Sequence, residues 1–219
     1  MPDKFVDPYL DPETGVLSNL VGARTYDDLA RAEGEFASLR MGELIERGDL
    51  HPAGTLDDFC RIHHALFQDI YAWAGCVRTV EIRKNVDGAE FFLPSTNIAM
   101  GMEWSRSELL GDKMLKGLER SAFLERLAYH YDNYNFVHPF REGNGRTQRV
   151  FWTLLCHDAG YDLDWRLVSG EENDEASRSA AEDRDYSQLI RMFSKIVTPC
   201  DPSAPINREL LAANHLHEE

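Results

Sequence analysis

The chain has 219 residues, of which 43% are hydrophobic and 28% are charged, and its 38 acids outnumber its 23 bases. This composition is typical of a soluble globular protein, and no apolar run reaches the roughly 20 residues that cross a bilayer, so we expect no contact with a membrane. A net charge of -15 argues against nucleic-acid binding, because that requires a clustered positive face. Any anionic ligand must be small and held locally.

The cysteines indicate a reducing compartment. Cys60, Cys76, Cys156 and Cys200 are scattered without any C-x-x-C pair, which argues against both a disulfide framework and a structural zinc site. The opening residues contain no basic region followed by an apolar segment, as a secretory signal would. We therefore expect a cytoplasmic protein.

The N-terminal part of the chain changes character at Thr25. Residues 1–24 are rich in Pro, Asp and Gly, which predicts an irregular lead-in. Thr25 is suited to cap a long helix that ends near Gly48. The apolar positions that define the buried face of this helix are predicted to be Leu29, Phe36, Leu39 and Leu44.

A second helix is predicted after Thr55 and should continue until Gly75. Its apolar residues recur at helical spacing: Leu56, Phe59, Ile62, Leu66 and Ile70. Residues 79–93 then break this period, and Asp87-Gly88 is a hairpin turn signal between two short apolar runs. We predict a short β-hairpin or flap, with too few strands for a sheet of its own.

Helical periodicity dominates the remainder of the chain. It covers residues 97–109, 121–134 and 150–160, and two shorter helices are predicted between residues 171 and 197. The fold class is therefore all-α, a helical bundle with one hairpin. We predict one domain over residues 25–198, followed by a loosely attached C-terminal tail over residues 199–219.

The most informative stretch is "NFVHPFREGNGRTQRVFW", which begins at Asn135. Gly143 and Gly145 stand where a helix begins, so the backbone can present its N–H groups to an anion, and a phosphate is the obvious one. Arg146 and Arg149 are three residues apart on the same helix and could both reach phosphate oxygens. Asn144 can add a neutral donor.

Two further residues of this stretch supply chemistry. A triphosphate in an acidic protein needs a cation, and Glu142 can hold Mg²⁺ through one carboxylate ligand. His138 ends the preceding helix and, with an ordinary pKa of about 6.5, can accept a proton from an incoming hydroxyl. Phe140, between these two, is expected to anchor the loop in the core.

The run "HPFREGNGR" followed by Thr147, Gln148 and Arg149 resembles the signature of Fic proteins, H-P-F-x-[D/E]-G-N-G-R-x-x-R, at every specified position. The upstream "FQDIYAWAGCVRTVEIRK" is also similar to the family, although more loosely. The resemblance implies a helical Fic fold with a flap over the active site. The implied activity is transfer of AMP from ATP-Mg to a Ser, Thr or Tyr hydroxyl of a target protein.

The resemblance also implies a role for each motif residue. His138 is similar to the base that deprotonates the target hydroxyl, and Glu142 to the magnesium ligand. The expected nucleotide-binding residues are Gly143, Asn144 and Gly145 around the phosphates, Arg146 at the outer phosphates and Arg149 at the γ-phosphate. Lys84 and the flap near Phe92 resemble the edge along which a target segment lies by strand addition.

Regulation is inferred from a motif that the sequence lacks. Many Fic proteins carry an inhibitory [S/T]-x-x-x-E-[G/N] helix whose glutamate pairs with the second arginine of the signature, and no segment here matches it. The chain therefore resembles the family's toxins that a small antitoxin restrains in trans by bringing the glutamate. Toxins of this size are similar to those that modify type II topoisomerases, which makes such an enzyme the implied target.

Two other functions remain open from the sequence. A Fic-type enzyme could transfer another phosphate-containing group, although Gly145 differs from the lysine of the phosphorylating variant. A non-catalytic nucleotide-binding adaptor would keep the phosphate-binding helix without the chemistry. The presence of His138 favours catalysis over the adaptor. No P-loop or kinase motif set is present in the sequence.

Overall fold

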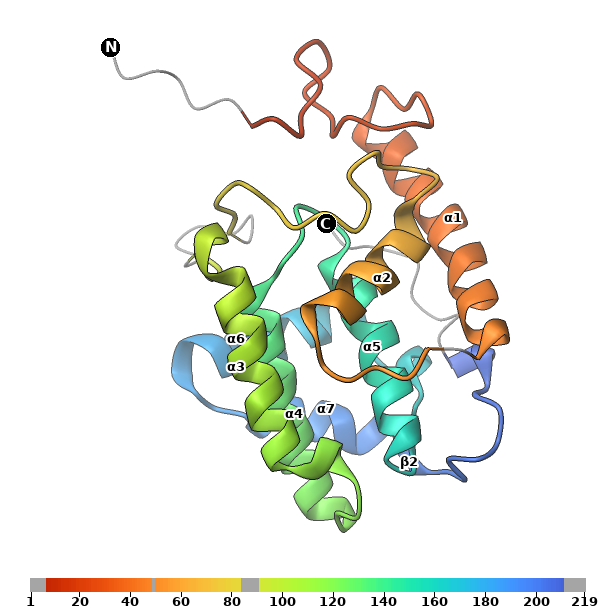
Figure 1. Cartoon of the computed structure of the whole chain (residues 1–219), viewed down its shortest axis with the longest axis vertical. Helices are drawn as coiled ribbons and strands as arrows, with labels where there is room; N and C mark the ends of the chain where they lie inside the picture. Colours follow the sequence, from red (N-terminus) through yellow and green to blue (C-terminus); the bar gives the residue numbers. More distant parts are fainter. Residues whose placement is uncertain (1–6, 49, 84–90, 211–219) are drawn as a thin grey trace.

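The computed structural model describes residues 7–48, 50–83 and 91–210, and in that part the protein is a bundle of seven α-helices with one two-stranded sheet (Figure 1). The helices are α1 (Tyr26–Arg47), α2 (Leu56–Phe67), α3 (Ile98–Gly111), α4 (Arg120–Val137), α5 (Asn144–Asp158), α6 (Gly170–Asp183) and α7 (Ser187–Ile196). The predicted fold class is confirmed, and each predicted helix is present.

Helix α5 forms the centre of the molecule. All residues from Val150 to His157 are buried, so the helix is covered on every side and must lie inside the bundle. It packs against α2 and α4, and Figure 1 shows it in the middle of the molecule. Phe151 joins the three helices, because its ring centroid lies 4.6 Å from that of Phe59 and 5.3 Å from that of Tyr134.

Helix α1 has the predicted ends but a different buried face. The Thr25 hydroxyl accepts a hydrogen bond from the Asp28 backbone N–H (3.2 Å), and Gly48 ends the helix in the left-handed region. Leu39, predicted to be buried, is 59% exposed. It lies two residues beyond the buried Ala37, which places it roughly 200° around the helix axis.

Helix α2 is shorter than predicted. A capping box between Thr55 and Asp58 starts it, but it ends at Phe67 and does not continue to Gly75. The next residues turn back, and the backbone N–H groups of Ile70 and Tyr71 both donate to the Phe67 carbonyl. Ile70 is fully buried in this turn, so this apolar residue packs in the core although it lies outside the helix.

The predicted flap lies partly outside the described residues, since its residues 84–90 are not among them. At its base, Arg83 and Phe91 form an isolated antiparallel bridge, and the Phe92 N–H donates to the Ile82 carbonyl (3.1 Å). The base of the flap therefore has the pairing of a hairpin.

The sheet is formed elsewhere, by β1 (Tyr161–Leu163) and β2 (Val197–Pro199), and the sequence did not indicate it. Tyr161 pairs with Pro199, the residue at which a loose tail was predicted to begin. The Cys200 N–H also donates to the Gly160 carbonyl (3.0 Å). The residue directly after β2 is thus attached to the domain. The sequence did not indicate this ribbon because two strands of three residues are too short to show an alternating pattern.

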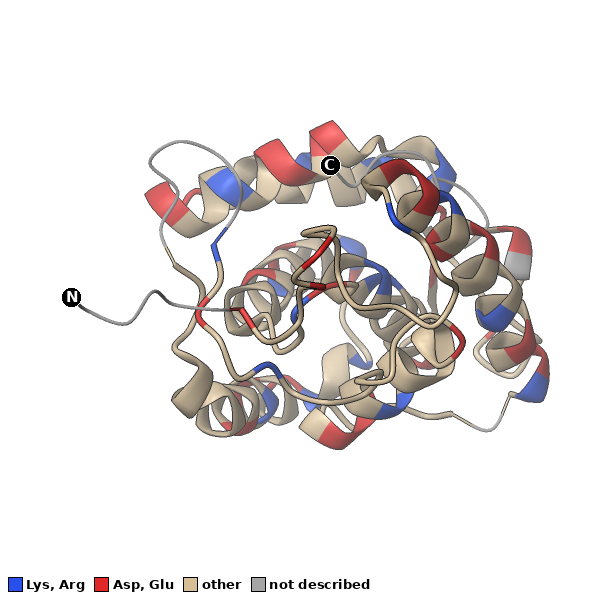
Figure 2. Ribbon diagram, turned by 90° about the horizontal axis from the view of Figure 1, so that it is seen from above, with Lys and Arg blue, Asp and Glu red and all other residues tan. Residues whose placement is uncertain are grey.

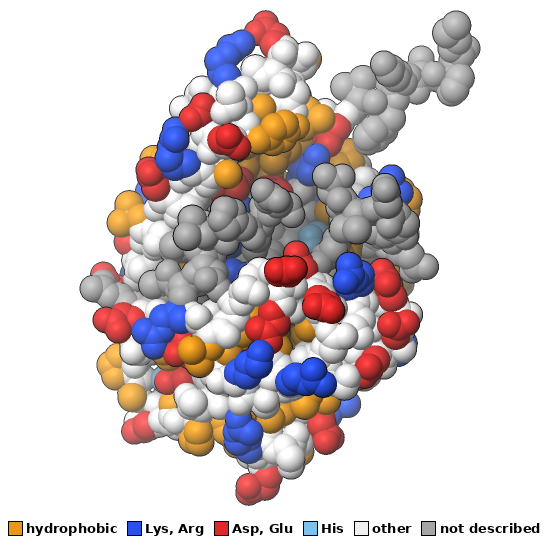
Figure 3. Space-filling model, turned by 180° about the vertical axis from the view of Figure 1, so that it is seen from behind, with side chains coloured by type: hydrophobic (Ala, Val, Ile, Leu, Met, Phe, Trp, Pro, Cys, Tyr) orange, Lys and Arg blue, Asp and Glu red, His pale blue; other side chains and the backbone are white. Residues whose placement is uncertain are grey.

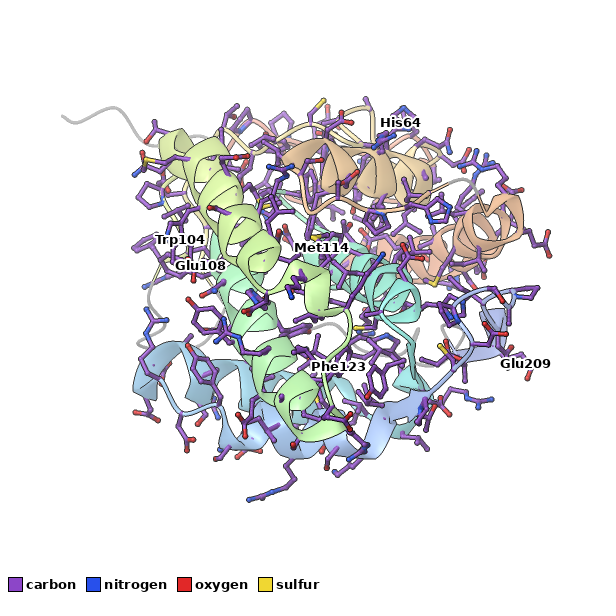
Figure 4. The ribbon with its side chains drawn as sticks, turned by 60° about the horizontal axis from the view of Figure 1, so that its bottom comes forward. His64, Trp104, Glu108, Met114, Phe123 and Glu209 are labelled. Atoms are coloured by element: carbon purple, nitrogen blue, oxygen red, sulfur yellow. The ribbon has the colours of Figure 1, made fainter. Side chains whose placement is uncertain are left out.

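The surface is mixed in charge. Lys and Arg are distributed among Asp and Glu on the ribbons (Figure 2), and the face in Figure 3 shows groups of apolar side chains between charged ones. Trp104 projects from the outer side of α3, where it is 52% exposed (Figure 4). No helix within the described ranges is long and apolar enough to cross a membrane.

Candidate active site

His138 stands directly after α4 in a conformation that few non-glycine residues adopt. Its backbone lies in the left-handed region (φ 46°, ψ 66°), and its ring Nδ1 lies 3.2 Å from the carbonyl oxygen of Asn135. A carbonyl only accepts hydrogen bonds, so Nδ1 carries a proton, and in the neutral ring the lone pair is on Nε2. In its neutral form this imidazole could act as a base only through Nε2.

Arg78 holds this strained turn in place. Its side chain is fully buried, and its guanidinium donates to the carbonyls of His138 (2.8 Å), Val80 (2.8 Å) and Leu93. Its backbone N–H donates to the Pro139 carbonyl (2.9 Å). Since strained backbone persists only where its surroundings enforce it, Arg78 is a structural residue that positions His138 relative to the flap.

Phe92 covers the His138 ring. The two rings stack with centroids 3.7 Å apart and an interplanar angle of 10°. The flap was predicted to border the active site near Phe92, and the structure places this side chain against the candidate base. Lys84, the other flap residue of the predicted site, lies outside the described residues.

The loop between His138 and α5 is closed by its own hydrogen bonds. The Asn144 side chain accepts from the Phe140 N–H (2.9 Å) and donates to the Phe140 carbonyl (2.8 Å). Phe140 is fully buried, as predicted for the anchor of the loop. The amide of Asn144 was expected to donate to a phosphate, but the structure uses it to shape the loop. A nucleotide contact through its backbone N–H stays a prediction.

His63 supports the loop from α2. Its Nδ1 accepts from the Gly75 N–H (2.8 Å), so its Nε2 donates to the Glu142 carbonyl (3.0 Å). Its ring also stacks on that of Phe140, with centroids 3.9 Å apart. Burial lowers the pKa of His63 to about 3, which keeps the ring neutral and its hydrogen-bond directions constant at physiological pH.

The start of α5 has the form of an anion site. Gly143 precedes the helix with φ +78°, and the first helical hydrogen bond runs from the Thr147 N–H to the Gly143 carbonyl (3.1 Å). The N–H groups of Asn144, Gly145 and Arg146 therefore lie at the open end of the helix, where an anion is favoured. A Cβ at position 143 would lie 2.5 Å from the Phe67 ring, so only glycine fits.

Arg146 is engaged by acids from two elements. Its guanidinium donates to Glu33 of α1 (2.7 Å) and to Glu142 (3.3 Å), and it lies 4.7 Å from the centroid of the Phe67 ring. Glu33 also accepts a hydrogen bond from the Tyr71 hydroxyl. Arg146 thus connects α1 to the candidate phosphate site.

Glu33 is a site residue that the sequence reasoning missed. It lies on the buried stripe of α1, four residues after Leu29 and four before Ala37, and is itself 8% exposed. A lone acid on the apolar face of a helix indicates a buried basic partner, because an unpaired buried charge is costly. The predicted apolar face included Leu39 and was therefore centred away from Glu33, so Glu33 was not recognised as a buried acid.

The two arginines of the signature contact different neighbours. Arg146 contacts α1 and α2, whereas the Arg149 guanidinium lies 5.8 Å from the centroid of the Trp165 ring in the short 3₁₀ helix Trp165–Leu167. A common phosphate contact for both side chains therefore stays a prediction.

Glu142 fits the role of a magnesium ligand by its chemistry and position. Its Oε1 accepts from the Gly143 N–H (2.8 Å), which places the carboxylate at the start of α5, and its side chain is 34% exposed. Mg²⁺ binds proteins through one or two carboxylates and takes its other ligands from phosphates and water.

Comparison with known proteins shows the family of the chain. The model of the Fic/DOC family matches residues 53–156. The "Probable protein adenylyltransferase Fic" of Escherichia coli K12 is 36% identical over 206 residues, which cover 93% of this chain and 100% of that protein. This chain belongs to the Fic/DOC family. The protein adenylyltransferase VbhT of Bartonella schoenbuchensis is 41% identical over 78% of this chain but only 35% of its own length, so the chain spans about a third of that relative.

Solved structures share the Fic fold. The N-terminal Fic domain of a Bartonella quintana effector, with bound ADP, has a TM-score of 0.78 and 25% identity and covers 88% of this chain and 95% of its own. BepC of Bartonella tribocorum, with bound AMPPNP, has a TM-score of 0.78, covers 88% of this chain and 97% of its own, and at 23% identity shows the fold alone.

Replacing Glu33 with alanine tests the link between α1 and the Fic motif. We expect Glu33→Ala to lower the free energy of unfolding by up to about 3 kcal/mol, because it leaves the largely buried Arg146 without this carboxylate. Glu35→Ala, on the exposed side of the same helix, should change it by less than about 0.5 kcal/mol. Urea denaturation measures both, and equal effects would contradict the link.

Replacing Gly143 with alanine separates backbone strain from steric overlap. Gly117 has a similar φ of +75° with nothing within 4 Å of an added Cβ, so Gly117→Ala should cost only about 1–2 kcal/mol. Gly143→Ala has the same strain and also forces the Phe67 ring away, so its cost should exceed that of the control by about 1–3 kcal/mol. Thermal unfolding of the two variants measures the difference.

The buried His63 predicts a loss of stability in mild acid. Unfolded His63 takes up a proton below about pH 6.5, whereas the folded ring, with a pKa of about 3, does not, so acid favours the unfolded state. This effect should lower the free energy of unfolding by about 2 kcal/mol between pH 7 and pH 5. Burial also lowers the pKa of His130, so His63→Gln should reduce the slope without abolishing it. An unchanged slope would contradict the prediction.

Proposed function

We propose that this protein is a protein adenylyltransferase that transfers AMP from ATP to a Ser, Thr or Tyr hydroxyl of a target protein. The observation that carries the proposal is the position of His138, with its Nδ1 against the Asn135 carbonyl, on the loop that leads into the open start of α5. The names of the relatives, which are protein adenylyltransferases, support the same activity.

The reaction follows from these groups. The phosphates of ATP bind over the turn formed by Gly143, Asn144 and Gly145, where the N–H groups of Asn144 and Gly145 lie at the open start of the helix and favour negative charge. Nε2 of His138 accepts the proton of the target hydroxyl while the hydroxyl oxygen attacks the α-phosphorus. The bond from the α-phosphorus to the bridging oxygen breaks, and pyrophosphate leaves. The stacked Phe92 ring keeps the imidazole in one orientation for this transfer.

Charge on the phosphates is balanced by the remaining site residues. Glu142 would hold Mg²⁺, which when bound neutralises part of the phosphate charge. Arg149 is proposed for the γ-phosphate and Arg146 for the outer phosphates. Because Arg146 also contacts Glu33, we propose that it anchors α1 as well.

The target segment is proposed to lie along the flap. The Arg83–Phe91 bridge gives the base of the flap the geometry of an exposed β-ribbon, to which an extended peptide can add as a strand. Lys84 belongs to the same proposed edge. Type II topoisomerases are the target class implied by the family's small toxins.

Restraint by an antitoxin in trans and a cytoplasmic location complete the proposal. The sequence has no inhibitory [S/T]-x-x-x-E-[G/N] motif, and the acid that α1 supplies, Glu33, contacts the first arginine of the signature. An antitoxin glutamate at Arg149 would therefore come from outside this chain. The four cysteines are free thiols, as a reducing compartment requires.

Substitution of His138 tests the function. With cell extract and ATP labelled at the α-phosphate, we expect the wild-type chain to label protein and His138→Ala to be slower by roughly 10²- to 10⁴-fold, with nucleotide binding retained. His64→Ala, an exposed histidine on α2, is the matched control and should label normally (Figure 4).

The position of the label distinguishes the reactions. Labelling from the α-phosphate alone indicates AMP transfer, whereas labelling from γ-labelled ATP alone would indicate phosphorylation and contradict the proposal. Full activity of His138→Ala would remove the assigned base. Nucleotide binding without any labelling, with extract or with candidate targets, would favour an adaptor.

A further inference from the structure

Three potential metal ligands meet at the end of α5 that is remote from the Fic motif. His157 lies in the last turn of the helix, Asp162 in β1, and Cys200 directly after β2. One ligand atom of each lies within 4.8 Å of the others. His157 lies fourteen residues beyond Gly143, which places this cluster about 20 Å from the start of α5, so it is distinct from the candidate active site.

We propose that His157, Asp162 and Cys200 form a binding site for a zinc ion. The arrangement of the atoms carries the proposal. Nδ1 of His157 lies 3.5 Å from Sγ of Cys200 and 2.7 Å from Oδ1 of Asp162. Around tetrahedral zinc, bonds of about 2.0–2.3 Å place nitrogen and sulfur ~3.5 Å apart and nitrogen and oxygen ~3.3 Å apart. The nitrogen–sulfur pair already has this separation, and the carboxylate must move by about half an ångström.

The histidine is oriented as a metal ligand. Its Nε2 lies 2.9 Å from the Ala204 carbonyl and must donate to it, so Nδ1 is the nitrogen that faces Asp162 and Cys200. Without an ion, Nδ1 donates a proton to the Asp162 carboxylate, and a metal ion at this site would displace that proton. A backbone carbonyl that accepts the second N–H is the usual outer partner of a zinc-bound imidazole. His157 is 4% exposed, so this orientation is enforced by packing.

Charge and ligand type select the cation. A thiolate and a carboxylate together carry two negative charges, which a divalent cation neutralises in a largely buried site. Thiolate and imidazole are ligands of zinc rather than of Mg²⁺ or Ca²⁺. Because zinc binds the thiolate form of cysteine, the ion must displace the thiol proton of Cys200, and binding should release protons to solvent.

The site would have a structural consequence. It joins the end of α5 to the β1–β2 ribbon and to the segment that follows, which runs toward Glu209 (Figure 4). The fourth position of the zinc falls to water or to a partner ligand, because three protein ligands leave it open. The sequence argued against zinc because the cysteines show no C-x-x-C spacing, but here the ligands come from three separate segments.

The test uses the full chain and does not depend on enzymatic activity. Titration with Zn²⁺, followed by calorimetry, should show a single equivalent bound and a rise in melting temperature. Titration with Co²⁺ should produce the near-ultraviolet charge-transfer band of a cobalt thiolate, and excess Mg²⁺ should not remove it. Cys200→Ala should abolish the band, and Asp162→Asn should weaken Zn²⁺ binding by about 10- to 100-fold.

Cys76→Ala is the matched control, because Cys76 is an exposed thiol on a different part of the chain and its loss should leave binding unchanged. The proposal is overturned when the wild-type chain binds no Zn²⁺ or shows no thiolate band with Co²⁺. The three residues would then only form hydrogen bonds between α5, β1 and the residue after β2. Loss of the band in Cys76→Ala would also overturn it. The wild-type spectrum decides the question even where a variant fails to fold.

Discussion

The reciprocal hydrogen bonds between Asn144 and the backbone of Phe140 are the constraint on which the candidate site depends. They close the segment from His138 to α5 into a rigid loop, and the buried Phe140 ring fixes that loop to the core. These bonds help to hold the imidazole and the helix start in a constant relative position. Preorganisation of this kind is what transfer chemistry demands of a protein.

Residues far apart in the sequence support the loop from three sides. Arg78 binds the backbone around His138, His63 binds the carbonyl of Glu142, and Glu33 binds Arg146. Each is a buried polar group with at least one hydrogen bond to the motif. These buried polar residues therefore surround the site, where removing one partner leaves another buried and unsatisfied.

Much of the fold, and the residues of the candidate site, could be predicted from the sequence. The helices have caps and apolar periods of their own, and the motif from His138 to Arg149 is contiguous, so its spacing is visible in the sequence. The predictions failed where packing overrides local pattern. Leu39 is exposed although apolar, α2 ends before Gly75, and Pro199 pairs with Tyr161 where a loose tail was expected.

The sequence by itself determined the helical class, the family signature and the identity of the candidate base, because these depend on residues close together in the chain. Only the tertiary structure decided that Glu33 contacts Arg146, that the Asn144 side chain shapes the loop, and that His157, Asp162 and Cys200 meet. The contact between Glu33 and Arg146 joins residues 113 positions apart in the chain. The Asn144 amide could either bind a phosphate or bond to the loop backbone, and its sequence position does not say which. Local propensity and spacing carry no information about such pairings, since packing alone brings the groups together.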